Sequence, residues 1–344
     1  MITVQRDRAT EEAQIAELVG GFLALQARNA AEENRPLRRV VHAKGVCVRA
    51  VFEVLDVWKG RTPALAARLA KGIYARPGCY PATVRFSNSD PSVSSDWRRD
   101  VRGLAFCVEL AGFVPVAVTR QDFSLQSAPT LPFTDVRALM VFVKVFTAPN
   151  QSAALGALPF SDQLTFARTM AEVMQQRRQP VRPYQQLRYW SAAAFRHGVE
   201  DVVKYSALPA RANRARALNL RKPNALRDEL VRHLNEDATM SSFDFALQLL
   251  DPDRMSYQGK RWDSNFWIEN VAVEWPEAQA PFHTVARLTL LPKSQLCAEA
   301  CEGAYIDVAA NSTPESAPVG GVNRVRSRAV TASRNSRLGR TSTG

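Results

Sequence analysis

Residues that bind metals are scarce in this sequence, which has four histidines and five cysteines among 344 residues. Cys297 and Cys301 have no second pair of cysteines or histidines nearby, so we expect no zinc site. Cys47 and Cys107 lie inside apolar, strand-like runs, a setting typical of buried free thiols in a reducing compartment. The cysteines therefore predict neither disulfides nor a zinc centre.

Long apolar segments are also missing. No stretch approaches the roughly 20 residues that a membrane-spanning helix needs. The first 18 residues carry several charges, acidic ones among them, which is unlike a secretory signal. No internal repeat or low-complexity linker divides the chain. These features predict a cytoplasmic protein with one domain and no transmembrane segment.

The positive charge of the chain is unevenly distributed. Lys and Arg number 45 against 33 Asp and Glu, and residues 321–340 hold six arginines and no acidic residue. Without these six arginines, 39 basic residues face 33 acidic ones, an excess of 6. Since no basic stripe with aromatic residues and no DNA- or RNA-binding motif is present, we expect no nucleic-acid partner. The alternative, binding through the tail, predicts salt-dependent DNA retention that deletion of residues 321–344 abolishes.

Apolar periodicity predicts the order of helices and strands. Helices are expected at 10–29, 62–72 and 224–237, and strands at 38–54, 82–88, 103–110, 114–119, 242–250, 268–275 and 284–292. Residues 134–212 have mainly helical patterns, with an irregular connection at 179–191. In the strand at 82–88, Thr83, Arg85 and Ser87 share one face, and Val84 and Phe86 share the other.

This order predicts an α+β fold, a mostly antiparallel sheet closed as a barrel, with a helical insertion. We divide the single domain, 1–344, into five parts. They are an N-terminal helix (1–35), a first barrel half (36–133), a mainly helical insertion (134–235), a second barrel half (236–310) and an arginine-rich tail (311–344).

Several short motifs occur in an order that resembles the haem catalase superfamily. They are "RRVVHAKG" (38–45), "YPATVRFSN" (80–88), "RDVRGLAF" (99–106), "QDFSLQSAP" (121–129) and "PVGGVNRVRSRAV" (318–330). Together with residues 268–292, they look most like the short catalase-like and hydroperoxide-processing branch. The resemblance covers about residues 38–140 and 236–337. It implies an eight-stranded antiparallel β-barrel with helices outside it and haem between the two.

The resemblance also implies roles for residues on the distal side of the haem. His42 would be the acid–base residue, and Ser87 would hydrogen-bond its imidazole. Arg39 and Arg85 would pair with the haem propionates, because a guanidinium stays charged and binds a carboxylate through two hydrogen bonds. Gln126 stands where the family has the asparagine that orients peroxide. A neutral imidazole suits the chemistry, since a proton must leave one peroxide oxygen and reach the other.

On the proximal side the resemblance is incomplete. The family's R-x-x-x-Y pattern, which supplies a tyrosinate to iron, falls on Arg326 and Val330, and a further propionate-binding arginine falls on Arg337. Valine cannot coordinate iron, and a one-residue shift in the alignment gives Thr331.

Three other residues are candidates for the missing ligand: Tyr257, Tyr305 and, as a thiolate, Cys301. Haem held without a protein ligand is a further alternative, so the metal ligand stays unassigned.

Two functions are consistent with these residues. The first is a haem-dependent oxidoreductase acting on hydrogen peroxide or an organic, lipid-like hydroperoxide. The second is a degenerate catalase fold that binds a ligand without haem redox turnover. The remaining histidines, His197, His233 and His283, have no motif around them and are interpreted as structural. Self-association into a homo-oligomer is compatible with either function.

Overall fold

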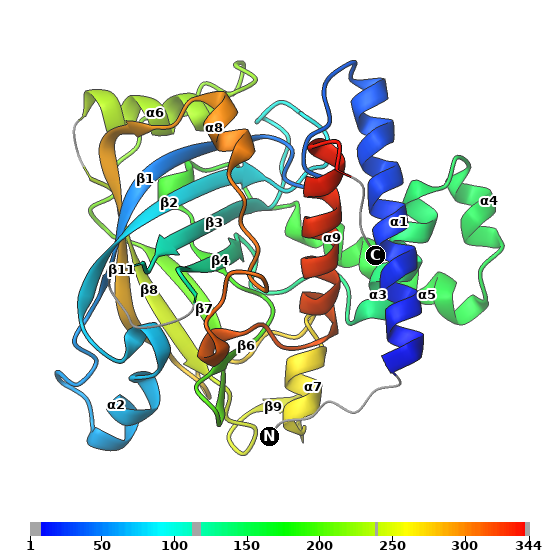
Figure 1. Cartoon of the computed structure of the whole chain (residues 1–344). Coiled ribbons are helices and arrows are strands. Elements are labelled where there is room, and N and C mark those ends of the chain that lie inside the picture. Colours follow the sequence, from blue (N-terminus) through cyan, green and yellow to red (C-terminus); the bar gives the residue numbers. More distant parts are fainter. Residues whose placement is uncertain (1–7, 112–117, 238–239, 341–344) are drawn as a thin grey trace.

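A computed structural model describes residues 8–111, 118–237 and 240–340. Eight strands form its centre: β1 (Gly45–Val54), β2 (Gly78–Asn88), β3 (Arg102–Glu109), β4 (Arg120–Gln126), β5 (Tyr189–Trp190), β7 (Asp201–Pro209), β8 (Ser242–Leu249) and β11 (Phe282–Gln295). Neighbours follow the order β5-β4-β3-β2-β1-β11-β8-β7, and pairing of β7 with β5 closes the ring (Figure 1). Every pairing in the ring is antiparallel. The predicted α+β fold with an eight-stranded barrel is confirmed.

Aromatic side chains fill the interior of the barrel. Phe52, Phe106, Phe123 and Phe245 are fully buried, and their ring centroids lie 4.7 to 5.8 Å apart. Burial of each ring stabilises the fold by about 1.5–3 kcal/mol. The inward alternation of the strands therefore builds a packed core, and space for a ligand has to lie outside the barrel.

Several helices cover one side of the barrel, with α9 lying beside α1 (Figure 1). They are α1 (Arg8–Glu32), α3 (Val136–Thr147), α4 (Gln151–Gly156), α5 (Phe160–Gln176) and α9 (Gly321–Arg337). Ile15 and Leu18 of α1, Leu139 of α3 and Val325 of α9 pack in one apolar cluster. The Asp135 carboxylate starts α3 by accepting a hydrogen bond from the amide of Ala138 at 3.0 Å.

Shorter elements complete the chain. They are the helices α2 (Pro63–Leu69), α6 (Ala225–Glu236), α7 (Ser264–Glu269) and α8 (Ala298–Gly303), 3-10 turns at Gly72–Tyr74, Tyr184–Gln186 and Pro314–Ser316, and the strands β6 (Phe195–His197), β9 (Ser256–Tyr257) and β10 (Lys260–Arg261). Within the described residues, no helix has both the length and the apolar character that a membrane crossing requires.

The structure corrects several boundaries. The strand predicted at 38–54 begins only at Gly45, so His42 precedes it. Residues 268–275, predicted as a strand, end the helix α7 and continue as an irregular segment. The strands β4, β5, β6 and β7 were not predicted. Most of the strand predicted at 114–119 lies outside the described residues.

A disulfide joins Cys47 of β1 to Cys301 of α8 across 254 residues of sequence, with the Cα atoms 5.3 Å apart. The prediction of no disulfide is therefore wrong, whereas Cys107 is a buried free thiol as expected. Sequence spacing could not reveal this pair because the barrel, not the local chain, brings α8 to β1. Since disulfides persist mainly in oxidising surroundings, the cysteines no longer support a reducing compartment.

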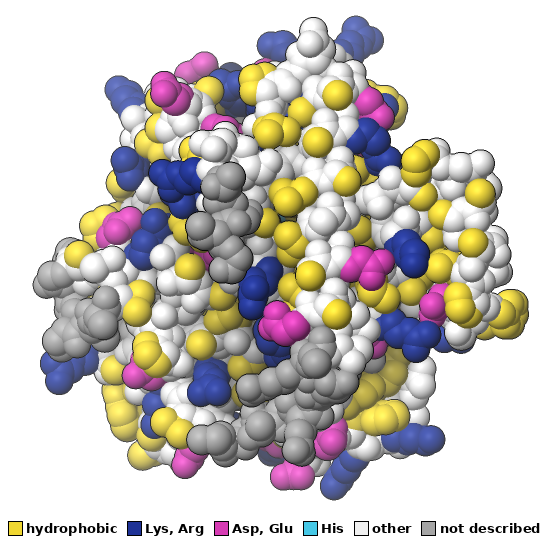
Figure 2. All heavy atoms as spheres, turned by 45° about the vertical axis from the view of Figure 1, so that its right-hand side comes forward, with side chains coloured by type: hydrophobic (Ala, Val, Ile, Leu, Met, Phe, Trp, Pro, Cys, Tyr) yellow, Lys and Arg dark blue, Asp and Glu magenta, His cyan; other side chains and the backbone are white. Residues whose placement is uncertain are grey.

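The helix-covered face of the molecule carries mixed charge. Figure 2 shows Lys and Arg side chains scattered on it among acidic and apolar ones. Part of the excess of arginine is paired there: Arg324 of α9 binds Glu11 at 2.6 Å, and Arg328 lies 3.3 Å from Glu12. On this face the basic side chains form no stripe of the kind that follows a phosphate backbone.

Candidate functional site

A cavity of about 430 Å³ lies between the barrel and the helices α1, α3, α5 and α9. Apolar side chains from the helices form most of its wall, among them Phe22, Leu139, Phe142, Val173 and Val325. A volume of this size suits a small organic molecule or cofactor, and such sites are mostly apolar with a few polar groups. The polar groups of this cavity decide its chemistry.

Four of the residues predicted from the sequence meet at this cavity: His42, Gln126, Arg326 and Val330. Ser87 lies directly behind His42, its Oγ atom 3.0 Å from Nδ1 of the imidazole. The structure therefore brings together one end of the first barrel half and the C-terminal helix α9, which are more than 190 residues apart in sequence.

The backbone of His42 is in the left-handed region, with φ of +59°. Such a conformation is uncommon for a residue other than glycine, although histidine adopts it more often than most, and it is often found at functional sites. The His42 amide donates to the carbonyl of Ser89 at 3.3 Å, and its carbonyl accepts from Nη2 of Arg85 at 2.8 Å. These contacts hold the turn that aims the ring.

Burial keeps the His42 imidazole neutral. Desolvation, and next the charge of Arg85, lower its pKa to about 3. Arg326 and Arg39 act in the same direction. At neutral pH the ring therefore offers one lone pair and one N–H, and the hydrogen bond to Ser87 occupies the Nδ1 side.

Two glycines make room for side chains of the site, Gly103 for the His42–Ser87 pair and Gly45 for Arg85. A Cβ atom on Gly103 would lie 2.6 Å from Ser87 Oγ and 2.9 Å from the His42 ring. A Cβ atom on Gly45 would lie 2.7 Å from the guanidinium carbon of Arg85. Both glycines stand in the motifs quoted above, "VVHAKG" and "RDVRGLAF", but their steric role becomes visible only when three strands are paired.

Gln126 lies in the cavity wall at the end of β4. Its Nε2 atom donates to the carbonyl of Thr130 at 2.7 Å and to that of Ala128 at 3.4 Å. Both N–H bonds of the amide are thus directed at the following loop. In this arrangement Gln126 orders the loop and has no N–H left to donate to a peroxide.

The other predicted arginines form a cluster outside the cavity wall. Nη1 of Arg39 and Nη1 of Arg337 each lie 3.0 Å from the Glu302 carboxylate. Burial lowers the pKa of all three arginines, to about 10 for Arg39 and about 9 for Arg85, and a guanidinium remains charged at neutral pH. Nε of Arg85 is buried without a hydrogen-bond partner.

Glu302 was not anticipated from the sequence. It sits on α8, next to Cys301, whose disulfide to Cys47 fastens α8 to the barrel. Arg39 strengthens this contact by donating to the carbonyls of Glu302 and Ala304. An internal carboxylate thus occupies two arginines that the resemblance assigns to propionates. A run such as "CAEACEGAY" (297–305) gives no local signal of this, because the contact with Arg39 spans 263 residues and the contact with Arg337 spans 35.

The α9 side of the cavity has no ligand for a metal. Val330 lines the cavity at the position of the family's tyrosine. Of the proposed substitutes, Tyr257 lies in the β9–β10 hairpin, 37% exposed, and Cys301 is in the disulfide. Tyr305 donates to Asp307 at 2.7 Å, and Thr331 donates to the same carboxylate at 3.2 Å. None of these four lines the cavity, and among the described residues no group of three or more His, Cys, Asp or Glu could hold a metal ion.

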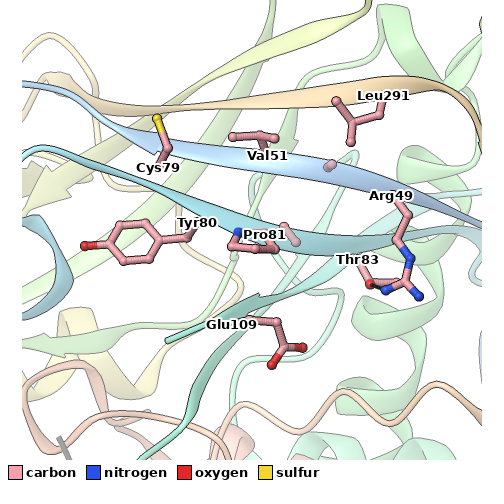
Figure 3. Close-up of a pocket in the computed structure, with 10 residues that line it drawn as sticks. Arg49, Val51, Cys79, Tyr80, Pro81, Thr83, Glu109 and Leu291 are labelled. Atoms are coloured by element: carbon pink, nitrogen blue, oxygen red, sulfur yellow. Dashed lines mark hydrogen bonds between the residues drawn. The ribbon is translucent and has the colours of Figure 1, made fainter. Parts of the chain in front are cut away.

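A second pocket lies on the outer surface of the barrel (Figure 3). It is bordered by residues of β1, β2, β3 and β11, and Arg49 donates to Thr83 Oγ1 at 2.8 Å across its edge. None of the residues predicted for the site lies in it, so the cavity beside α9 is the candidate site.

Two further histidines are buried. His233 of α6 lies 2.9 Å from Ser241 Oγ and 3.3 Å from Asp237, and His197 of β6 packs beside Tyr74. Neither lines the cavity. His283, on the barrel strand β11, does not line it either.

Comparison with known proteins supports the fold. The sequence matches no protein-family model, and no curated protein matches it. The structure is similar to a fungal catalase, with a TM-score of 0.66 and 14% identity over 91% of this chain and 62% of that chain. It is also similar to catalase A from Saccharomyces cerevisiae, with a TM-score of 0.62 and 14% identity over 90% of this chain and 62% of that chain. A bacterial catalase matches with a TM-score of 0.58 and 15% identity over 89% of this chain and 58% of that chain.

The chain spans about three-fifths of the length of these catalases. At this level of identity the similarity establishes the architecture, while activity has to be argued from the site. The chain therefore has a catalase-like fold.

Proposed function

We propose that the chain is a haem-dependent oxidoreductase that acts on hydrogen peroxide or an organic hydroperoxide. The observation that carries the proposal is the His42–Ser87 pair, a buried and neutral imidazole in the wall of a cavity that α9 closes on another side. The apolar walls of the cavity favour an organic hydroperoxide over hydrogen peroxide.

His42 would move the proton. Since Nδ1 faces Ser87, Nε2 is the nitrogen that can take a proton from one peroxide oxygen and return it to the other. With its pKa lowered to about 3, an imidazolium formed during turnover releases its proton readily. Haem, when bound, supplies a redox-active iron for the cleavage of the O–O bond.

The buried charges also support haem. Arg39, Arg85 and Arg337 carry three positive charges, and Glu302 compensates one of them. Arg85 is buried and Arg39 and Arg337 are partly buried; an uncompensated buried charge costs up to several kcal/mol, so a ligand with two further negative charges is favoured here. Haem carries two propionates, and these arginines are the residues that would hold them.

The fit to haem is incomplete, and this favours a second candidate function. Val330 has no donor atom, and Glu302 already engages Arg39 and Arg337. A catalase-fold protein that binds a small molecule without haem redox turnover would have these two features.

An absorption spectrum of the full chain, expressed with adequate haem supply, separates the two candidates. We expect a Soret band stoichiometric with protein, and a loss of hydroperoxide turnover of about 100-fold or more in His42→Ala, as for a general acid–base residue. Val330→Tyr should shift the band, whereas the matched control Val330→Phe, of similar bulk but without the hydroxyl, should not.

The other outcomes are equally informative. A band that is absent in the parent and restored only in Val330→Tyr supports the second candidate. If neither protein binds haem, the haem proposal is refuted.

A further inference from the structure

Arg326 stands out among the arginines of α9 because it lacks an acidic or aromatic partner. Arg324 binds Glu11, Arg328 binds Glu12 and Arg337 binds Glu302. Arg334 stacks over the ring of Tyr305 at 4.3 Å. Within the described part of the chain, the hydrogen bond of Arg326 is to the neutral amide of Asn323, at 3.3 Å, and no carboxylate lies within 4 Å of it.

The surroundings of Arg326 make this lack of a partner costly. On α9 the other residues in the cavity wall are Val322, Val325, Ala329 and Val330. Burial among them lowers the pKa of Arg326 to about 10, so the guanidinium is still charged at neutral pH. Arg326 is half-buried in the cavity wall, and a partly desolvated charge without a counter-ion destabilises the folded state, a cost that a carboxylate on the guanidinium would reduce.

The other charged groups of the cavity do not supply the counter-ion. The Asp100 carboxylate accepts from Ser89 Oγ at 2.6 Å and from the amide of Asp90 at 2.8 Å, and it lies 3.8 Å from Nε of Arg177. His42 is neutral. An anion from outside the chain is the partner that this site can accept.

We infer that the cavity binds a small apolar monocarboxylate, with its carboxylate on Arg326 and its apolar part against the valines of α9. The volume of about 430 Å³ accommodates such a molecule, and the apolar wall excludes strongly hydrated inorganic anions in favour of an organic one. The inference goes beyond the proposed function and uses only side chains of this chain, so it does not depend on haem, which would compete for the same cavity.

Calorimetric titration of the full chain, prepared without added haem, with benzoate tests the inference. Benzamide, which has the same ring and no charge, is the control ligand. A charge-assisted hydrogen bond contributes enough that benzoate should bind at least about tenfold more tightly than benzamide. Arg326→Met should lose this preference, and Arg326→Lys should keep part of it. Arg328→Met, on the same helix but facing Glu12, should bind benzoate as the parent does.

Thermal denaturation shows whether the Arg326→Met variant is folded, so that a loss of binding is not mistaken for a loss of structure. Because Arg326→Met removes an uncompensated buried charge, it should unfold at the same temperature as the parent or higher, and benzoate should raise the unfolding temperature of the parent alone. Equal binding of benzoate and benzamide, or undiminished benzoate binding by a folded Arg326→Met, would overturn the inference. Benzoate binding in a chain that never takes up haem would leave it intact while refuting the proposed function.

Discussion

Gly103 is the position at which a single methyl group should separate His42 from Ser87. Gly103 pairs directly with Ser87 across β2 and β3, so an added Cβ atom points at that pair. It would lie 2.6 Å from Ser87 Oγ and 2.9 Å from the His42 ring. Ser87 is held between two paired strands, and therefore the His42 ring is the group that has to move.

The expected cost of Gly103→Ala follows from these contacts. Overpacking a well-filled site costs about 1–3 kcal/mol, and the hydrogen bond between the two side chains contributes about 0.5–1.5 kcal/mol. Alanine recovers about 0.5–1 kcal/mol because glycine is unfavourable inside a strand. We expect a net loss of about 0.5–4 kcal/mol in the free energy of unfolding, together with a higher pKa of His42 as its ring leaves its position beside Ser87.

Urea denaturation and an NMR titration of the histidine ring measure the two effects. Gly156→Ala is a matched control, since a Cβ atom there meets no atom within 4 Å. The control should leave the pKa of His42 unchanged and, because Gly156 ends the helix α4, should raise the free energy of unfolding by at most about 0.5–1 kcal/mol. If Gly103→Ala is as stable as the parent and its His42 titrates identically, the reasoning that this glycine makes room for the pair is refuted.

Other predictions concern the disulfide and two buried bases. Replacing Cys47 and Cys301 with serine should lower the free energy of unfolding by about 2–4 kcal/mol, since the cross-link restricts the unfolded chain; an unchanged urea midpoint would contradict this. The pKa of His42 falls from 6.5 to about 3 on folding, so between these values the unfolded chain binds more protons and stability is lost as the pH falls. The unfolding temperature of His42→Gln should therefore depend less on pH between 6.5 and 4 than that of the parent; equal slopes would count against a buried neutral imidazole. Burial lowers the pKa of Lys204 from 10.5 to about 7, and stability should rise with pH across that window. Lys204→Met should accordingly raise the unfolding temperature more at pH 7 than at pH 10.5, and a uniform shift would argue against the buried cation as the cause.

Much of the barrel could be predicted from apolar periodicity, because β2, β8 and β11 alternate between core and outer face. The strand β7 was missed although Val203 to Ala207 alternate between apolar and polar residues, because it lies within residues 134–212, where helical patterns dominate. Residues 268–275 alternate like a strand, yet Trp267 and Trp275 are buried in a separate apolar cluster that holds them in α7 and the turn after it. Periodicity cannot distinguish these cases without knowledge of which surfaces meet.

The site could be predicted only where its residues stand in local motifs. His42, Ser87, Arg326 and Val330 were found in this way, and the structure places three of them in one cavity wall with Ser87 behind His42. The pairing of Glu302 with two arginines could not be found, because it depends on the position of α8 against β1. The same holds for the helices α1, α3 and α5, whose amphipathic patterns predict a buried face but not what that face covers.

The arginine cluster behind His42 and Arg326 on α9 together carry an excess of positive charge. The cluster behind His42 has three arginines and one glutamate, and Arg326 adds a fourth cation on α9, which leaves three positive charges without a carboxylate among the described residues. Arg39, Arg85 and Arg326 keep pKa values of about 9 to 10, well above neutrality, so their deprotonation does not relieve the excess. A dianionic ligand at the cluster or a monoanion at Arg326 would each reduce it, and since both would use the same cavity, they would compete. Removing Glu302 would increase the uncompensated positive charge at the cluster by one. It would leave the charge at Arg326 unchanged, because within the described residues the Glu302 carboxylate pairs with Arg39 and Arg337.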